Sequence, residues 1–294
     1  LVPNVLARRA GDEEVVPLWS PELPGGGRPR PQGRAPWALE TGGRGQDLRE
    51  VVYFSACVGT LFGPGDDGPG VRTAFLSLCR RAGVVLVAPG NLPGLCCGTP
   101  WRSKGMLEGA QAMEQRVAAS LWEATRGGEL DVVSDAASCT EGLVTTLSHA
   151  AETDARYAGI RVVDAVAYVA AELLPELPRT QPRLQRLALH PTCSSTQLGL
   201  DPALMTVARA VADEVFGPDS WGCCGFAGDR GLLHPELTAS ATQVQSAQIA
   251  QAGPFDAYAS CNRTCELGMT RATGQQYQHV LELLDLATRA PGPG

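Results

Sequence analysis

Two pairs of adjacent cysteines are the residues of this chain best suited to chemistry. Cys96-Cys97 and Cys223-Cys224 are each followed directly by a glycine, Gly98 and Gly225. Adjacent cysteines are badly placed for a relaxed disulfide, and glycine lets the backbone take positive φ values and curl around a bulky group. Two thiolates on one small loop suit a soft metal or an iron–sulfur cluster. The sequence therefore predicts two cluster-binding loops rather than a disulfide framework.

Further cysteines repeat in the same order around both pairs. Cys96 and Cys223 lie 127 positions apart, and Cys139 and Cys265 lie 126 apart. Cys57 and Cys193 are 136 positions apart because the first half carries an extra glycine-rich loop around residues 63–70. The near agreement of two offsets, with the third displaced by one loop, indicates an internal duplication. The two sets are Cys57, Cys96, Cys97 and Cys139, and then Cys193, Cys223, Cys224 and Cys265.

Three residues outside these sets have open roles. Cys261 stands four positions before Cys265 and is either a fifth ligand of the second half or a bystander. His190 stands three positions before Cys193 and is a hydrogen-bonding neighbour of the cluster, an ordinary capped histidine or a direct ligand. Cys79 lies on the apolar stripe of a helical pattern and has no counterpart in the second half, which indicates a buried core thiol.

Short β-prone runs alternate with helical patterns along the chain, which predicts parallel sheets with crossover helices. The cysteine loops follow predicted strands, and the carboxyl ends of parallel strands meet at one edge of a sheet. We therefore expect one thiolate cage in each half of a duplicated α/β fold whose two domains are related by a pseudo-twofold axis. The predicted strands are 51–55, 84–87, 131–134, 160–163, 187–190 and 256–260, and the predicted helices are 71–81, 105–125, 165–174, 202–216, 235–251 and 277–288.

Composition divides the chain into three parts. Residues 1–48 are rich in Pro, Gly and Arg and predict an extended linker that lies over the surface. Residues 49–178 form the first predicted cysteine-rich domain and 179–294 the second, with prolines around 175–182 marking the connection. The chain starts at Leu1 inside this linker, so we expect it to be part of a longer polypeptide.

Charge and hydropathy exclude several classes of function. The formal net charge of −7 leaves no basic surface for nucleic acid. No apolar run approaches the roughly 18 residues of a membrane span, and no targeting segment is visible. We therefore expect a cytoplasmic protein, at most peripheral to the inner face of the membrane. Motifs for nucleotide binding or serine hydrolysis are not found.

The repeated C…CCG…C pattern resembles the tandem cysteine-rich (CCG) domains of the heterodisulfide reductase B subunit and the glycolate oxidase iron–sulfur subunit. Within that superfamily the chain is more similar to the C-terminal iron–sulfur region of FAD-dependent D-lactate dehydrogenases. The stretches that carry this resemblance are 17–24, 96–105, 222–231, 234–237 and 263–274.

The resemblance implies an iron–sulfur electron-transfer module of an FAD-dependent D-2-hydroxyacid (D-lactate) dehydrogenase. It implies one or two 4Fe-4S clusters held by the cysteines of the two sets, with FAD in an upstream domain. A ferredoxin-like segment would also lie upstream, and electrons would pass to a quinone or cytochrome acceptor. Heterodisulfide reductase ends each motif in CxxC, whereas the first half here offers only Cys139 and the second offers CxxxC. A thiol/disulfide reductase module and a structural zinc domain remain as alternatives.

Overall fold

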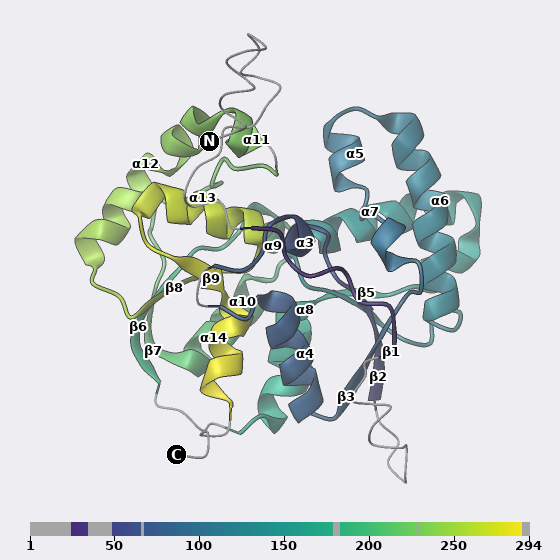
Figure 1. Ribbon diagram of the computed structural model, residues 1–294, viewed down its shortest axis with the longest axis horizontal. Coiled ribbons are helices and arrows are strands. Elements are labelled where there is room, and N and C mark those ends of the chain that lie inside the picture. The colour runs from purple at the N-terminus through teal and green to yellow at the C-terminus, as the bar shows by residue number, and fades with distance from the viewer. Residues whose placement is uncertain (1–24, 35–48, 66–67, 179–182, 229, 290–294) are drawn as a thin grey trace.

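Two sheets of mainly parallel strands, both covered by helices, build the molecule (Figure 1). The computed structural model describes residues 25–34, 49–65, 68–178, 183–228 and 230–289. The first sheet has the strand order β1-β3-β2-β4-β5 and the second β7-β6-β8-β9. The strands are β1 (Gly33–Arg34), β2 (Arg49–Phe54), β3 (Val84–Ala88), β4 (Val132–Ser134), β5 (Val162–Asp164), β6 (Leu184–Leu189), β7 (Ala212–Phe216), β8 (Ala257–Ser260) and β9 (Tyr277–His279).

Without β1, the two sheets have the same strand order and every neighbouring pair is parallel. The helices also repeat, including one of 18 residues in each half, α6 and α12. The predicted α/β fold with parallel sheets and crossover helices is thus confirmed. The helices are α3 (Val58–Leu61), α4 (Val71–Arg81), α5 (Thr99–Ser103), α6 (Leu107–Ala124), α7 (Ala137–Thr153), α8 (Ala165–Tyr168), α9 (Cys193–Gln197), α10 (Asp201–Val211), α11 (Arg230–Leu233), α12 (Pro235–Ala252), α13 (Arg263–Thr273) and α14 (Val280–Ala287).

The shorter helical turns are η1 (Leu92–Gly94), η2 (Ala155–Gly159), η3 (Val169–Leu173) and η4 (Leu174–Glu176). The turn η3 continues α8 with π-helical geometry. None of the helices in the described part of the chain has both the length and the apolar character needed to cross a membrane.

Two predicted helices are wrong at one end. The helix predicted over 202–216 ends at Val211, and residues 212–216 form β7. This strand is at the edge of its sheet, pairs only with β6 and is half exposed, so its sequence lacks the apolar run that marked the other strands. The helix predicted over 277–288 begins at Val280, because residues 277–279 pair with β8 and the His279 side chain caps the helix that follows.

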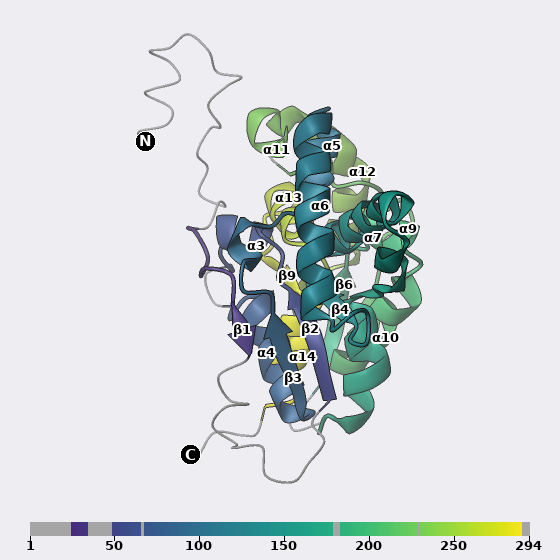
Figure 2. The ribbon, with the colours of Figure 1, turned by 90° about the vertical axis from the view of Figure 1, so that its right-hand side faces the viewer.

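The predicted linker contains an ordered segment that belongs to the first sheet. Strand β1 pairs antiparallel with β3, and Figure 2 shows it at the edge of that sheet. Arg30, just before β1, is buried, so this part of residues 1–48 does not simply lie over the surface. The rest of the predicted linker (1–24 and 35–48) and the predicted connection at 179–182 lie outside the described residues.

One hydrophobic core runs through both halves. Tyr53 and Phe75 from the first half belong to the same buried cluster as Leu204 and Leu281 from the second. The helix contacts between the halves are reciprocal: α4 meets α14 while its counterpart α10 meets α8, and α3 meets α13 while α9 meets α7. Reciprocal contacts of this kind are what a two-fold axis produces. The fold therefore has the predicted pseudo-twofold arrangement.

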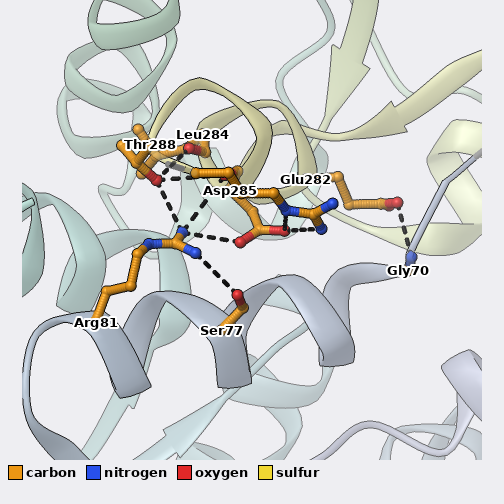
Figure 3. A network of polar contacts seen from close by, with 8 residues as sticks. Gly70, Ser77, Arg81, Glu282, Leu284, Asp285 and Thr288 are labelled. Atoms are coloured by element: carbon orange, nitrogen blue, oxygen red, sulfur yellow. Dashed lines mark hydrogen bonds and ion pairs between the residues drawn. The ribbon is translucent and has the colours of Figure 1, made fainter. Parts of the chain in front are cut away.

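Buried polar contacts join α4 of the first half to α14 of the second (Figure 3). Arg81 Nη2 lies 2.8 Å from Asp285 Oδ1 and donates to Thr288 Oγ1 at the same distance. Glu282 accepts a hydrogen bond of 2.8 Å from the Gly70 amide, just before α4. The Asp285 side chain is fully buried, so loss of its partners would leave an uncompensated charge. These contacts make the relative placement of the halves specific.

Candidate metal centres

The first four-cysteine set lies together at the carboxyl edge of the first sheet. Cys57 follows β2 at the N-cap position of α3, Cys96 and Cys97 lie in the loop between η1 and α5, and Cys139 is in the first turn of α7. The thiols of Cys57 and Cys96, of Cys96 and Cys97, and of Cys97 and Cys139 lie close enough to shift the pKa of their neighbours. The four thiols thus form a continuous row, which we call the first row.

The second set forms a row in the same order. Cys193 begins α9 after β6, Cys223 and Cys224 lie between β7 and α11, and Cys265 is in the first turn of α13. The thiols of Cys193 and Cys223, of Cys223 and Cys224, and of Cys224 and Cys265 lie close enough to shift the pKa of their neighbours. In this second row Cys193 and Cys223 are exposed, whereas no member of the first row is fully exposed.

Glycines at two equivalent points allow each loop to close on its helix. Gly98 and Gly225 take φ values of 95° and 69°, a region that glycine enters without strain. Gly142 and Gly268, three residues after the last cysteine of each row, face the cysteine pairs. A Cβ at Gly142 would lie 3.1 Å from Cys97 Sγ, and one at Gly268 would lie 3.4 Å from Cys224 Sγ. The shared CxxG spacing was the sequence signal for these helix glycines.

Neighbouring thiols of the first row have their pKa shifted in opposite directions. The thiols of Cys57 and Cys97 lower the pKa of Cys96 to about 3, while the Cys96 thiol and burial raise the pKa of Cys57. In the second row, burial and the Cys223 thiol raise the pKa of Cys193 to about 11. Metal binding requires thiolates, so occupation of either row would release protons.

Arg30 is a buried neighbour of the first row that sequence reasoning missed. It comes from the segment before β1 and is 7% exposed. Its guanidinium donates to the carbonyl oxygens of Ser55, Leu92 and Leu95, each at 2.6 Å. Nothing in the spacing of the Pro- and Arg-rich tract distinguished Arg30 from its exposed neighbours, because its role depends on where the segment crosses the sheet.

His190 is the corresponding buried neighbour of the second row. It is 1% exposed, and neither ring nitrogen has a hydrogen-bond partner at normal distance in the described structure. One ring nitrogen and the sulfurs of Cys224 and Cys265 all lie within 4.8 Å of one another. Burial lowers the pKa of His190 to about 4, so the ring is neutral near pH 7. The ring is therefore available to donate a hydrogen bond to a bound metal centre or to ligate it.

The remaining two cysteines lie apart from the rows. The sulfur of Cys261 is 3.7 Å from Thr192 Oγ1, and its side chain is buried in the core shared by the two halves. Cys79 is fully buried on α4 in the same core, where burial raises its pKa. Of the two candidates near the end of the second set, Cys265 is the one whose sulfur joins the row.

Comparisons with known proteins concern the sequence of the chain. Residues 51–143 match the model of the cysteine-rich (CCG) domain family, a range that contains the whole first row. Over 248 residues the chain is 24% identical to the glycolate oxidase iron-sulfur subunit of Escherichia coli (strain K12). That alignment covers 81% of this chain and 58% of the subunit, so the chain spans well under two thirds of the relative's length.

Among solved structures, a crystal structure of an aspartate racemase homologue from Pyrococcus horikoshii OT3 matches at 12% identity. The match covers 82% of this chain and 100% of the other, with a TM-score of 0.29. A TM-score of this size carries no argument about fold or function.

Proposed function

We propose that this chain is the iron–sulfur electron-transfer part of a flavin-dependent 2-hydroxyacid oxidoreductase. The observation that carries the proposal is the repetition of one four-thiol row, in the same order and on equivalent elements, in both halves. Four thiolates form the usual ligand set of a 4Fe-4S cluster. The similarity to a glycolate oxidase iron-sulfur subunit supports the same class of protein.

The donor sets fit such clusters chemically. Cys57, Cys96, Cys97 and Cys139 would hold one cluster, and Cys193, Cys223, Cys224 and Cys265 the other. Each cluster would supply reversible one-electron uptake. The chain's own contribution is to curl the loops through Gly98 and Gly225 and to keep the inner thiols out of water, since Cys97 and Cys224 are each 3% exposed.

Direct contacts between the ligand-bearing elements of the two halves support electron passage between them. Asn262 Nδ2 donates to Ser138 Oγ at 3.2 Å, and Ser138 directly precedes Cys139. Ser194 Oγ donates to Glu141 Oε2 at 2.7 Å, and Ser194 directly follows Cys193. Residues next to a ligand of one row thus touch the helix or loop that carries a ligand of the other.

The finer assignment follows the resemblance to FAD-dependent D-lactate dehydrogenases. We propose that FAD outside this chain accepts two electrons and two protons from D-lactate or a similar D-2-hydroxy acid. The electrons would then pass one at a time to this chain and on to a quinone or cytochrome acceptor. In this scheme the protein works in the cytoplasm, at the inner face of the membrane.

A structural zinc site is the second candidate function, and one observation favours it. The ring of His190 and the thiols of Cys224 and Cys265 lie close enough to share one metal ion. Nitrogen and sulfur donors are those that zinc prefers. The first row contains no comparable histidine, since Phe54 occupies the position three residues before Cys57.

Metal analysis of the protein purified without oxygen separates these functions. We expect iron and acid-labile sulfide in similar amounts, with visible absorbance that dithionite bleaches. Zinc in place of iron would contradict the electron-transfer proposal. For the substrate, D-lactate and glycolate are added separately to the complete flavin-containing enzyme. We expect D-lactate to bleach the same absorbance faster; bleaching by glycolate alone would reassign the substrate.

A further inference from the structure

The segment that carries Arg30 is fastened across the loop of the first cysteine. The amide of Gly27 donates to the Thr60 carbonyl at 2.8 Å, and the amide of Gly63 donates to the Gly25 carbonyl at 2.7 Å. A Cβ at Gly27 would lie 2.0 Å from the Gly59 carbonyl oxygen, so the two backbones are in direct contact. Strand β1 then pairs with β3. Arg30 is therefore held between two attachment points.

The carbonyls that Arg30 binds belong to the two loops that carry ligands. Ser55 stands two residues before Cys57, and Leu95 stands directly before Cys96. The guanidinium also lies over the Phe54 ring, 4.8 Å from its centroid. Its Nη2 atom is buried and has no hydrogen-bond partner in the described structure. One side chain thus joins the Cys57 loop to the Cys96 loop while part of its hydrogen-bonding capacity stays unused.

The acidic groups that act on Arg30 are thiols of the first row and one buried carboxyl group. Burial lowers the pKa of Arg30, and Cys57, Cys139, Asp135 and Cys96 oppose that shift when they are ionised. A guanidinium in a protein stays protonated. Carbonyl oxygens carry no net charge, so the contacts to Ser55, Leu92 and Leu95 orient the group without neutralising it. The first row therefore has a fixed buried cation beside it.

The second row has a different neighbour. His190 occupies the position three residues before Cys193, and its ring is neutral near pH 7. Burial is the main cause of the raised pKa of Cys193, and the nearby Cys223 thiol and Glu141 carboxyl group raise it further. The two rows thus hold similar thiols in different electrostatic environments.

We propose that Arg30 raises the reduction potential of the centre held by the first row and leaves that of the second row unchanged. The inference rests on the proposed iron–sulfur function. Reduction adds one electron to the centre, and a cation held nearby at low dielectric stabilises the added negative charge. Arg30 acts through the field and through the two loops it joins, so it is a positioning residue.

The test is a potentiometric titration of the protein that is monitored by electron paramagnetic resonance. Cys97→Ser and Cys224→Ser variants assign each signal to its row. We expect Arg30→Gln to shift the midpoint potential of the first-row signal to more negative values, with the second-row signal unmoved. Arg30→Lys keeps the charge and should hold the first-row potential near that of the unsubstituted protein. Arg34→Gln, a half-exposed arginine of the same segment, serves as the matched control.

Each outcome decides the inference. Unchanged potentials in Arg30→Gln, or equal shifts of both signals, would overturn it. Loss of first-row iron in Arg30→Gln but not in Arg30→Lys would support a requirement for the charge. Loss in both would show that Arg30 acts by packing alone and would overturn the electrostatic role. Absence of iron from the unsubstituted protein would instead refute the proposed function on which the inference rests.

Discussion

The two halves hold their thiols on equivalent strands and helices but surround them with different groups. Counting from the first cysteine of each row, Phe54 corresponds to His190 and Ala56 to Thr192. Counting from the last cysteine, Asp135 corresponds to Cys261. Duplication has thus kept the four thiols and the glycines that let the loops close, whereas the neighbours that set charge and polarity have changed.

The pair Asp135 and Cys261 shows how one position can serve the same purpose with different chemistry. Asp135 accepts a hydrogen bond of 2.6 Å from the Ala56 amide, directly before Cys57. Cys261 contacts the side chain of Thr192, directly before Cys193. Both residues directly follow a strand and contact the loop of the first cysteine. The comparison indicates that Cys261 takes the place of Asp135 rather than that of a ligand.

The largest expected effect is the loss of one cluster, from one row or the other, when a buried cysteine is replaced. Cys97 and Cys224 are the third, buried thiols of their rows, and each lies between two neighbouring thiols of its row. We expect Cys97→Ser and Cys224→Ser each to lower iron and sulfide content by about one cluster. Reduction of an external acceptor should slow in both variants, while flavin reduction by substrate in the complete enzyme survives. Cys79→Ala is the control with full iron content, and loss of both half-reactions together would contradict an electron-relay role.

A smaller difference between the two halves is expected in the stability effects of alanine at the helix glycines, Gly142 and Gly268. A Cβ at Gly142 would lie 2.2 Å from Thr99 Oγ1 and 3.0 Å from the Cys97 carbonyl oxygen, whereas at Gly268 the nearest atom would be 3.2 Å away. We expect Gly142→Ala to lower the free energy of unfolding by about 1–3 kcal/mol through overpacking. In Gly268→Ala the milder contact should be offset by the ~1 kcal/mol that alanine gains over glycine inside a helix.

Chemical denaturation and iron analysis of the two alanine variants measure this difference. The first-row iron should fall in Gly142→Ala, and the second-row iron should be retained in Gly268→Ala. Equal effects in the two variants would show that both helices accommodate a Cβ atom beside the cysteine loop equally well. This outcome would contradict the contacts described above.

Much of this arrangement could be predicted from the sequence because it depends on local pattern. Alternating apolar runs and helical stripes define parallel sheets, and parallel sheets bring the ends of their strands to one edge. The repeated spacing of the cysteines then predicts that each half carries one row of thiols at that edge of its sheet. Strand β7 escaped prediction because an edge strand needs no apolar run on its exposed side, and Ala212-Asp213-Glu214 offers none.

The electrostatic neighbours could not be predicted, since they depend on tertiary placement. Arg30 lies 27 residues before Cys57, in a tract without hydrophobic period, and reaches the first row only because its segment is pinned over the Cys57 loop and against β3. His190 was recognised as a neighbour of Cys193, but its unpartnered nitrogens and its closeness to Cys224 and Cys265 follow from the fold.

The smallest expected effect is at Cys261, and it tests the equivalence with Asp135 most directly. Cys261→Ala removes one buried sulfur whose contact is with Thr192, so the unfolding free energy should fall by about 1–2 kcal/mol, as for other small deletions in a core. Iron content should stay unchanged, whereas Cys265→Ala should lose second-row iron. If both variants lose iron equally, Cys261 is a fifth ligand and the two halves hold centres of different type.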